Sequence, residues 1–410
     1  MTRRLLVLAA RNLSRHSRRT LLTGLIVVVG YAATAMTAGF VAQSFRGLRE
    51  ATIRGQGGEI RILDARAAGK TDDEATSILL ARWEEVASVA REDPRVRGAS
   101  PRLSFFGLAV RGEKSIPYLG SGVVPAAEKG ASFVPEIVAE GNFLPDATAD
   151  DAMAGTGLLR ALGGKVGEPI TVMTTTADGA LNAVDATVVA RLEYPIREVD
   201  DRLLVLPFAA AARLLRAEGK ASSVLLQLAP GTDEEEVALS LRERLRSRGR
   251  DVLVRTWVET ASFYRQVKLL YAAIFGFTGL VLATVVVLAA ANTMTMSVLE
   301  RTREIGMLLA LGMERRHVRG LFLLEGLLLG LAGSLGGAVG SVLLRAALNA
   351  ARLSMPPPPG GARGMVLHVD FIPEAYVVGL LLMTLTLVAA SWWPARRAAR
   401  LDPVEALAHV

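Results

Sequence analysis

Residues that could carry out catalysis are few in this chain of 410 residues. It contains no cysteine, so neither a thiolate nucleophile nor a thiolate metal site can form. None of the four histidines lies at a metal-binding spacing from carboxylates: His16, His317, His368 and His409. No G-x-S-x-G sequence, which would expose a nucleophilic serine on a tight turn, occurs either. The sequence therefore predicts a protein that is not an enzyme.

A phosphate-binding loop is missing as well. Such a loop has the form G-x-x-x-x-G-K-[ST], in which backbone N–H groups and the lysine hold the phosphates. The nearest strings, 163–166 and 219–221, have neither the spacing nor the hydroxyl residue. This chain is not expected to bind a nucleotide in that way.

The charged segment 300–312 has the most regular pattern. Apolar residues and a glycine recur there at i, i+3, i+4 and i+7, which indicates one face of a two-turn helix, and charges surround it. Gly312 would end this helix because glycine tolerates positive φ. The helix could rest on lipid or fit a groove on a cytoplasmic partner. The residues concerned are Arg301, Arg303, Glu304, Ile305, Leu308, Leu309 and Gly312.

A stripe of glycines follows in the next apolar segment. Its members, separated by 4, 3, 4 and 3 positions, are Gly326, Gly330, Gly333, Gly337 and Gly340. Small residues on one face let helices approach closely in lipid, so we predict a helix-packing face. Glu325 lies one turn inside the membrane boundary, and we favour an ion pair with an arginine of the preceding loop over a side chain that reaches out to the interface.

Four segments are apolar enough to span a membrane. The longest uncharged run, 269–299, has 31 residues and would make a helix of about 46 Å, longer than a hydrocarbon core of about 30 Å. The other runs are 20–45, 326–344 and 375–393. Each has at least the 18 or so residues that a span requires.

Arginines in the short flanks of these spans predict the orientation. Residues 1–19, 300–319 and 394–410 hold 14 arginines, whereas the connection between the third and fourth spans holds Arg345, Arg352 and Arg363. By the positive-inside rule both termini and the 300–319 loop are cytoplasmic, and the segment 46–268 lies outside. The net charge of +7 thus reflects topology, with anionic lipids as the counter-charge, and nucleic acid is not an expected partner.

The amino-terminal segment allows two readings. Residues 17–22, S-R-R-T-L-L, and 33–35, A-T-A, are similar to parts of a cleaved export signal. The apolar run is longer than in such signals, so we expect a retained span. Residues 1–19 should form an interfacial helix that precedes it.

Segment 46–268 has a mixed pattern. Short β-branched runs predict strands at 59–64, 169–176, 185–193, 222–229 and 251–256, and Asp178-Gly179 predicts a hairpin turn. Helices are expected at 72–92, at 207–218 and from Thr232 to about 248. We interpret the segment as an α+β subdomain interrupted by a smaller β subdomain between about 102 and 193.

The resulting division of the chain ends in a cytoplasmic tail with a short final helix that starts at Asp402. Its parts are an interfacial helix, 1–19; a first span, 20–45; an exported α+β domain, 46–268; a second span, 269–299; a cytoplasmic coupling loop, 300–319; a third span, 320–345; an external loop with a stiff proline-rich stretch, 346–374; a fourth span, 375–393; and the tail, 394–410.

Two sequence stretches resemble the FtsX/MacB-type ABC transporter permeases. They are E-R-T-R-E-I-G-M-L-L-A-L-G at 300–312 and P-A-R-R-A-A-R-L-D-P-V-E-A-L at 394–407, and R-N-L-S-R-H-S-R-R-T-L-L at 11–22 is similar to the family's amino-terminal helix. The resemblance implies an α-helical membrane protein with four transmembrane helices and an inserted α+β periplasmic domain, located in the bacterial inner membrane.

The resemblance also implies how such a protein works. The coupling segment would bind a separately encoded ABC ATPase dimer, which would hold the ATP and Mg²⁺, so no cofactor is expected in this chain. A second copy or a paralogue would complete the membrane part. The absence of an ATPase segment favours split permeases similar to LolC and LolE, which release lipoproteins; an FtsX-like scaffold that activates a periplasmic cell-wall hydrolase is the alternative.

Overall fold

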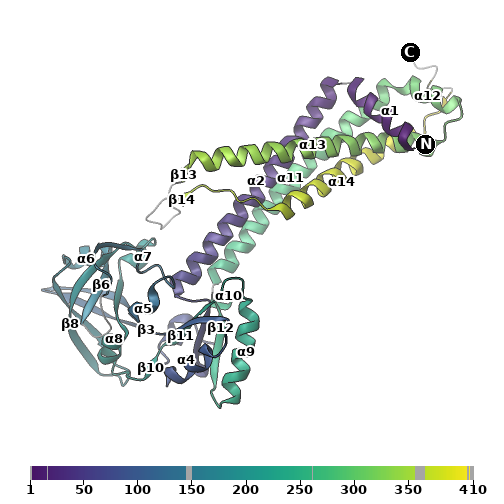
Figure 1. The fold of residues 1–410 in the computed structure, drawn as a ribbon. Coiled ribbons are helices and arrows are strands. Elements are labelled where there is room, and N and C mark those ends of the chain that lie inside the picture. The colour runs from purple at the N-terminus through teal and green to yellow at the C-terminus, as the bar shows by residue number, and fades with distance from the viewer. Residues whose placement is uncertain are drawn as a thin grey trace. The chain divides into compact units, whose positions relative to one another are not determined.

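The computed structural model describes residues 2–15, 17–144, 150–260, 262–355, 365–403 and 406 (Figure 1). The chain divides into two compact units. A helical unit comprises residues 1–46, 267–354 and 366–410, and an α/β unit comprises residues 47–266 and 355–365. The predicted architecture, a helical membrane part with an inserted α+β domain, is confirmed.

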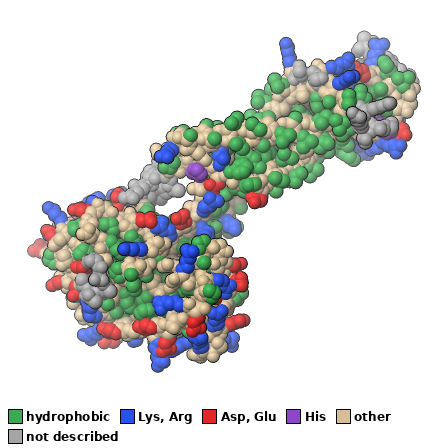
Figure 2. Space-filling view, in the orientation of Figure 1, with side chains coloured by type: hydrophobic (Ala, Val, Ile, Leu, Met, Phe, Trp, Pro, Cys, Tyr) green, Lys and Arg blue, Asp and Glu red, His purple; other side chains and the backbone are tan. Residues whose placement is uncertain are grey.

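The helical unit contains four helices that are long and apolar enough to cross a membrane. They lie within α2 (Ser17–Gln56), α11 (Ser262–Glu300), α13 (Arg315–Ala351) and α14 (Pro373–Ala398). All four contribute to one buried cluster, which includes Val27, Val286, Leu329 and Leu387. Hydrophobic side chains cover the outside of this unit in Figure 2, as expected for helices that face lipid.

Two hydrogen bonds between polar side chains and neighbouring helices join members of this unit. Thr23 and Thr293 share a hydrogen bond of 2.6 Å, which joins α2 to α11. The Tyr31 hydroxyl donates to the carbonyl oxygen of Tyr376 at 2.7 Å, which joins α2 to α14. In lipid no water would satisfy these groups, so their pairing fixes the relative rotation of the helices.

Shorter elements complete the unit. Helix α1 (Thr2–Arg15) precedes α2, in the place of the predicted interfacial helix, and α12 (Thr302–Ala310) lies between α11 and α13. The external connection contains the short paired strands β13 (Ser354–Met355) and β14 (Met365–Val366). Its proline-rich stretch, 356–361, lies outside the described residues, and so does most of the final helix predicted from Asp402.

The α/β unit is built on a ten-stranded sheet in the order β12-β1-β11-β3-β4-β9-β6-β8-β5, with β7 paired to β3 and β8. Its strands are β1 (Ile60–Asp64), β3 (Val96–Arg111), β4 (Lys114–Val123), β5 (Val138–Gly141), β6 (Asp151–Gly155), β7 (Pro169–Thr175), β8 (Leu181–Leu192), β9 (Leu203–Pro207), β11 (Ser223–Leu228) and β12 (Val252–Thr256). A separate pair consists of β2 (Leu80–Ala81) and β10 (Lys220–Ala221).

Helices cover this sheet over two hydrophobic cores. Helices α4 (Trp83–Arg91) and α9 (Glu234–Ser247) pack on β1, β11 and β12, while α6 (Thr156–Leu162) and α8 (Phe208–Leu215) pack on the strands of the other half. The 16-residue strand β3 gives Val96 and Ala99 to one core and Leu103 and Phe105 to the other. Two subdomains thus share one strand, and the inserted one extends to α8, beyond the residue 193 that we expected.

Five predicted strands and the hairpin turn are confirmed. Asp178 and Gly179 connect β7 to β8, and Gly179 has φ +88°. The single helix predicted for 72–92 is wrong: it is divided into α3 (Asp72–Thr76) and α4, with β2 between them. Leu80 is buried in the core and pairs with Ala221 of β10, so strand pairing replaces the helical turn there. Helix α9 has Asp233 rather than Thr232 at its N-cap.

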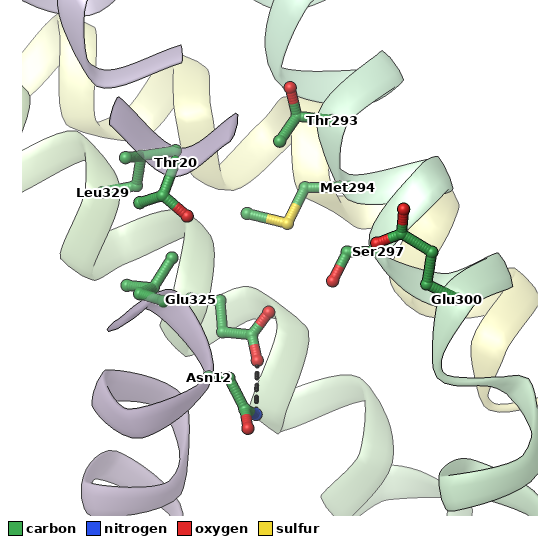
Figure 3. A pocket seen from close by; sticks show the side chains of 9 residues that line it. Asn12, Thr20, Thr293, Met294, Ser297, Glu300, Glu325 and Leu329 are labelled. Atoms are coloured by element: carbon green, nitrogen blue, oxygen red, sulfur yellow. Dashed lines mark hydrogen bonds between the residues drawn. The ribbon is translucent and has the colours of Figure 1, made fainter. Parts of the chain in front are cut away.

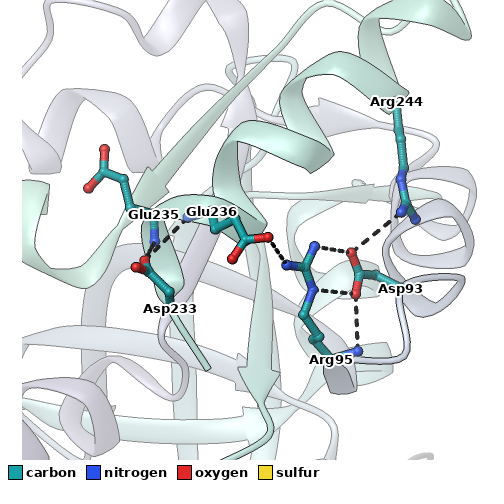
Figure 4. A network of polar contacts seen from close by, with 6 residues as sticks. All are labelled: Asp93, Arg95, Asp233, Glu235, Glu236 and Arg244. Atoms are coloured by element: carbon teal, nitrogen blue, oxygen red, sulfur yellow. Dashed lines mark hydrogen bonds and ion pairs between the residues drawn. The ribbon is translucent and has the colours of Figure 1, made fainter. Parts of the chain in front are cut away.

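A polar network holds α4 against α9. The carboxylate of Asp93, which is 1% exposed, accepts two hydrogen bonds from the guanidinium of Arg95 at 2.9 and 3.0 Å and one from the Arg95 amide at 3.0 Å (Figure 4). Arg95 also contacts Glu236 of α9 at 3.0 Å, and Arg244 of α9 lies 3.7 Å from Asp93. The hydrogen bonds from Arg95 lower the pKa of Asp93 below its ordinary value of 3.8.

We predict that Asp93→Asn lowers the opening free energy of α4 and α9 by about 2 kcal/mol at neutral pH, because Arg95 loses a charged acceptor. Since the folded-state pKa is depressed, the contribution of Asp93 is full above its unfolded pKa of about 4 and is lost as the pH falls through the lower folded value. Hydrogen exchange on the full chain measures both effects.

The control is Glu235→Gln, because Glu235 is exposed at the start of the same helix and points away from the network in Figure 4. If the opening free energies of wild type and Asp93→Asn differed by the same amount in strong acid as at neutral pH, the stabilising role of the Asp93 charge would be contradicted.

Candidate coupling site

Helix α12 begins and ends as the sequence pattern predicts. Gly312 has φ +91°, and its amide donates to the carbonyl oxygen of Leu309 at 3.0 Å. The amide of Met313 donates to Leu308 at 3.0 Å. These two bonds form a Schellman motif, in which glycine at C′ accepts the left-handed backbone that other residues disfavour. The chain then enters α13 at Arg315.

A buried ion pair fixes the start of α12. Arg301 is 7% exposed and Glu325 of α13 is 2% exposed. The Nη1 atom of Arg301 lies 3.1 Å from Glu325 Oε1, and its Nε donates to Glu304 Oε2 at 3.2 Å. The pairing of Glu325 with an arginine of the loop is confirmed. Because a buried charge without its partner is costly, this pair holds α12 to α13.

Helix α1 joins the same pair. The Nδ2 of Asn12 donates to Glu325 Oε1 at 2.7 Å (Figure 3). A cavity of about 20 Å³ lies beside these groups, lined by Asn12, Leu13, Thr20, Thr293, Met294, Ser297, Glu300, Glu325 and Leu329. Three transmembrane helices and α1 line this small space, which could hold about one water molecule. The carboxylate of Glu325 therefore sits at the point where α1, α12 and α13 meet.

The apolar stripe of α12 faces the chain itself. Ile305 is 2% exposed and packs with Val318 and Phe322 of α13 and with Ala395 of α14, and Leu309 packs on the same cluster. The side chains of Arg301 and Ile305 are therefore not available to a separate subunit in this conformation. Leu308 is half-buried, while Arg303, Glu304 and Gly312 are exposed.

The opposite face of α12 offers apolar side chains that the sequence analysis missed. Leu311 is 79% exposed, and Met307, which precedes it by one turn, is about half exposed. Arg303 and Glu314 flank them on the exposed side. Their i, i+4 spacing is present in the sequence, but the longer stripe that contains Ile305 and Leu309 indicates the other face, which packs within the chain. Asn12 was missed because no local pattern marks it.

Four of the five striped glycines lie at close helix contacts. A Cβ at Gly326 would lie 3.2 Å from the carbonyl oxygen of Leu387, and one at Gly330 would lie 3.0 Å from the Cα of Thr384, both in α14. At Gly333 and Gly337 the neighbour is α2, with Val27 Cγ1 at 2.6 Å and Tyr31 Cβ at 2.7 Å. A Cβ at Gly340 would meet nothing within 4 Å. The stripe thus divides between two partner helices.

The residues that the structure describes include no cluster of three or more His, Asp or Glu side chains that could hold a metal ion.

Two family models match the chain. One, described as FtsX-like permease C-terminal, matches residues 269–403. The other, described as MacB-like periplasmic core domain, matches residues 20–244, which is more than half of the chain. The chain belongs to the FtsX/MacB-type ABC transporter permeases. This permease is a multi-pass protein of the inner membrane with its large domain in the periplasm.

Several curated relatives are similar to the permease. The lipoprotein-releasing system transmembrane protein LolC of Xylella fastidiosa is 27% identical over 79% of this chain and 81% of its own length. LolE of Haemophilus influenzae is 25% identical over 81% of this chain and 82% of its own length. The macrolide export ATP-binding/permease protein MacB of Escherichia coli is 30% identical over 50% of this chain and 30% of its own length.

Solved structures are similar to the periplasmic part. The periplasmic region of MacB from Actinobacillus actinomycetemcomitans aligns with 52% of this chain and 92% of its own, at 12% identity and a TM-score of 0.38. The extracellular domain of the transporter YknZ from Gram-positive bacteria aligns with 48% of this chain and 100% of its own, at 13% identity and a TM-score of 0.36.

We predict that Glu325→Leu in the permease lowers the opening free energy of α12 by about 3 kcal/mol, because the buried Arg301 keeps only the half-exposed Glu304. The double variant Arg301→Leu/Glu325→Leu should regain most of this loss, since no buried charge remains. Hydrogen exchange of residues 302–310 measures both. Glu304→Gln is the control and should change little. A double variant as unstable as Glu325→Leu would contradict the assignment.

We also predict that Gly337→Ala lowers the thermal stability of the permease in detergent, by about 1–3 kcal/mol, because its new methyl would meet Tyr31 and the carbonyl oxygen of Val28 at 2.8 Å. Gly340→Ala is the matched control and should be neutral or slightly stabilising, since alanine favours a helix over glycine. Equal stability of the two variants would contradict the packing role of Gly337.

Proposed function

We propose that this permease passes an ATP-driven movement from a cytoplasmic ABC ATPase dimer to its periplasmic domain, which releases or exports a lipoprotein or another amphipathic cargo. The ATPase would bind the ATP and Mg²⁺. The observation that carries the proposal is α12: a short helix anchored by a buried ion pair, with Met307 and Leu311 on its exposed face. The similarity to two proteins named for lipoprotein release supports the cargo class.

The contacts of α12 support its role as a coupling element. Arg301, the N-cap residue of α12, binds Glu325 of α13, and Asn12 of α1 binds the same carboxylate. Gly306 lies against Ala406 of the carboxyl-terminal segment, where a Cβ would be 2.6 Å from that of Ala406. A displacement of α12 would therefore act on three parts of the membrane unit together, because each contact is buried and leaves little room to slide.

The long helices support transmission along the chain. Helix α2 has 40 residues and α11 has 39, and each has residues in both units. The last turns of α2 are bound within the α/β unit: Arg54 donates to Glu136 at 2.5 Å, and Arg49 forms an ion pair with Glu234 of α9. A continuous hydrogen-bonded helix is stiff along its axis, so a shift at one end reaches the other.

The partners follow from this proposal. The ATPase dimer would need two permease subunits, so a second copy or a paralogue would complete the membrane part. Membrane lipids surround the exposed apolar faces. A periplasmic protein could deliver or receive the cargo.

We predict that Met307→Asp/Leu311→Asp, which changes two exposed side chains, removes the ATPase that co-purifies with the permease and abolishes its stimulated ATP hydrolysis. A charge on each anchor would remain unpaired in an apolar groove of the partner. Leu181→Asp is the control, because Leu181 is an exposed leucine of the periplasmic domain. Unchanged co-purification and hydrolysis would overturn the coupling role.

Reconstituted vesicles that contain the permease, its partner and the ATPase then test the cargo. We expect a lipid-anchored protein to leave them only when ATP is hydrolysed. If hydrolysis is coupled to the permease but no amphipathic cargo leaves, the release function is wrong and a signalling scaffold is the better account.

A further inference from the structure

A second polar site lies in the α/β unit, far in sequence from α12. It is a pocket of about 280 Å³ over the central strands β1, β3, β4, β9 and β11. The helices α6 and α8 pack against Leu103 of β3, whereas Arg102, Ser104 and Phe106 of the same strand line the pocket. Because successive side chains of a strand point to opposite faces, the pocket opens on the face away from those helices.

Strand register brings together polar side chains on this face. Ser223 of β11 is opposite Arg102, and Ser121 of β4 is opposite Ser104. All four line the pocket, together with Arg61 of β1. Paired residues of antiparallel strands project from the same face, so these groups form one continuous polar floor.

The lining has a positive charge. It contains Arg61 and Arg102 and, among the described residues, no acidic side chain. Arg102 pairs with Glu128, which lies outside the lining, at 2.7 Å. An anion bound in the pocket would therefore meet arginine side chains and serine hydroxyl groups that can donate hydrogen bonds to it.

An unsatisfied hydroxyl also lines the pocket. Ser223 is 1% exposed, and its Oγ makes no hydrogen bond to any described residue. Native proteins rarely bury such a group without a partner, so this atom is an independent sign of a missing acceptor or donor.

The other end of the pocket is apolar. Phe106 is 48% exposed at the middle of β3, although the opposite face of the same strand is buried. Leu119 is opposite Phe106 on β4, and Leu203 is opposite Leu119 on β9. Leu108, the next residue on this face of β3, is also exposed and extends the apolar surface. An exposed aromatic beside aliphatic side chains is typical of a binding surface.

We propose that this pocket binds a small amphiphile, with an anionic head group, a carboxylate or a phosphate, beside Arg61 and Arg102 and an apolar tail along Phe106 and Leu119. A water-sized group takes up about 30 Å³. The pocket volume of about 280 Å³ therefore has room for a head group and a tail of several carbons. This proposal does not depend on the proposed coupling function, because amphiphile binding is measured on the permease without an ATPase.

The test uses the full chain in phosphatidylcholine nanodiscs, with empty discs as the blank for partitioning into lipid. Octanoate and octyl phosphate are titrated by calorimetry, and octanol is the uncharged probe. We expect one saturable site per chain for at least one of the two anions, and at least tenfold weaker binding of octanol.

Two variants assign the site. Arg61→Gln removes one charge and Phe106→Ser removes the exposed ring, and each should weaken binding of the anion at least fivefold. The matched controls are Arg66→Gln, which removes an exposed arginine just beyond the same strand, and Leu181→Ser, which removes an exposed leucine elsewhere; both should bind as wild type does. Hydrogen exchange of β3 confirms that each variant is folded.

Three results would overturn the proposal: no saturable binding of either anion, octanol binding as tightly as the anions, or Arg61→Gln and Phe106→Ser binding as their controls do. Discs that contain phosphatidylglycerol then distinguish the sources. Competition by this lipid would support the site and identify a lipid head group as its occupant, whereas undiminished octanoate binding would support a free amphiphile.

Discussion

The buried carboxylate of Glu325 is the constraint on which the inner end of the membrane unit depends. A charge at 2% exposure must have partners, and here they come from Arg301 and Asn12, which belong to different elements. The requirement is therefore more than a contact between two helices. It forces α1, α12 and α13 to meet at one point, so α12 cannot detach without breaking an ion pair between two buried charges.

The glycine stripe provides the complementary constraint within the membrane. Gly326 and Gly330 admit α14, and Gly333 and Gly337 admit α2, at distances that any larger residue would prevent. Helices in lipid gain little from the hydrophobic effect among themselves, so close packing and paired polar groups such as Thr23 and Thr293 hold them together. Helix α13 is thus the central member of the unit, since both constraints lie along it.

The sequence predicted the parts that depend on local pattern. Four spans, the stop at Gly312, five strands and the turn at Asp178 all follow from composition and short-range periodicity. The helix expected at 72–92 failed because Leu80 pairs with β10, which lies about 140 residues later, and no local signal reports such a pairing. The partnership of Asn12 with Glu325 spans 313 residues and was invisible for the same reason. The pocket in the α/β unit also arises from register between distant strands.

The two apolar faces of α12 have different surroundings, and this difference bears on the coupling role that we propose for it. A helix that only connects two spans needs one apolar stripe, which Ile305 and Leu309 supply by packing on α13 and α14. Met307, which is 51% exposed, and Leu311, which is 79% exposed, give it a second apolar surface. Exposed apolar side chains on a short helix weaken solubility unless something covers them. Arg303, Glu314 and Arg315, which lie near them in the sequence, are exposed as well, and exposed apolar side chains accompanied by charged ones are typical of a protein interface. The proposed coupling role requires two such faces, because a helix with a single apolar face could bind its own subunit or another one but could not connect them.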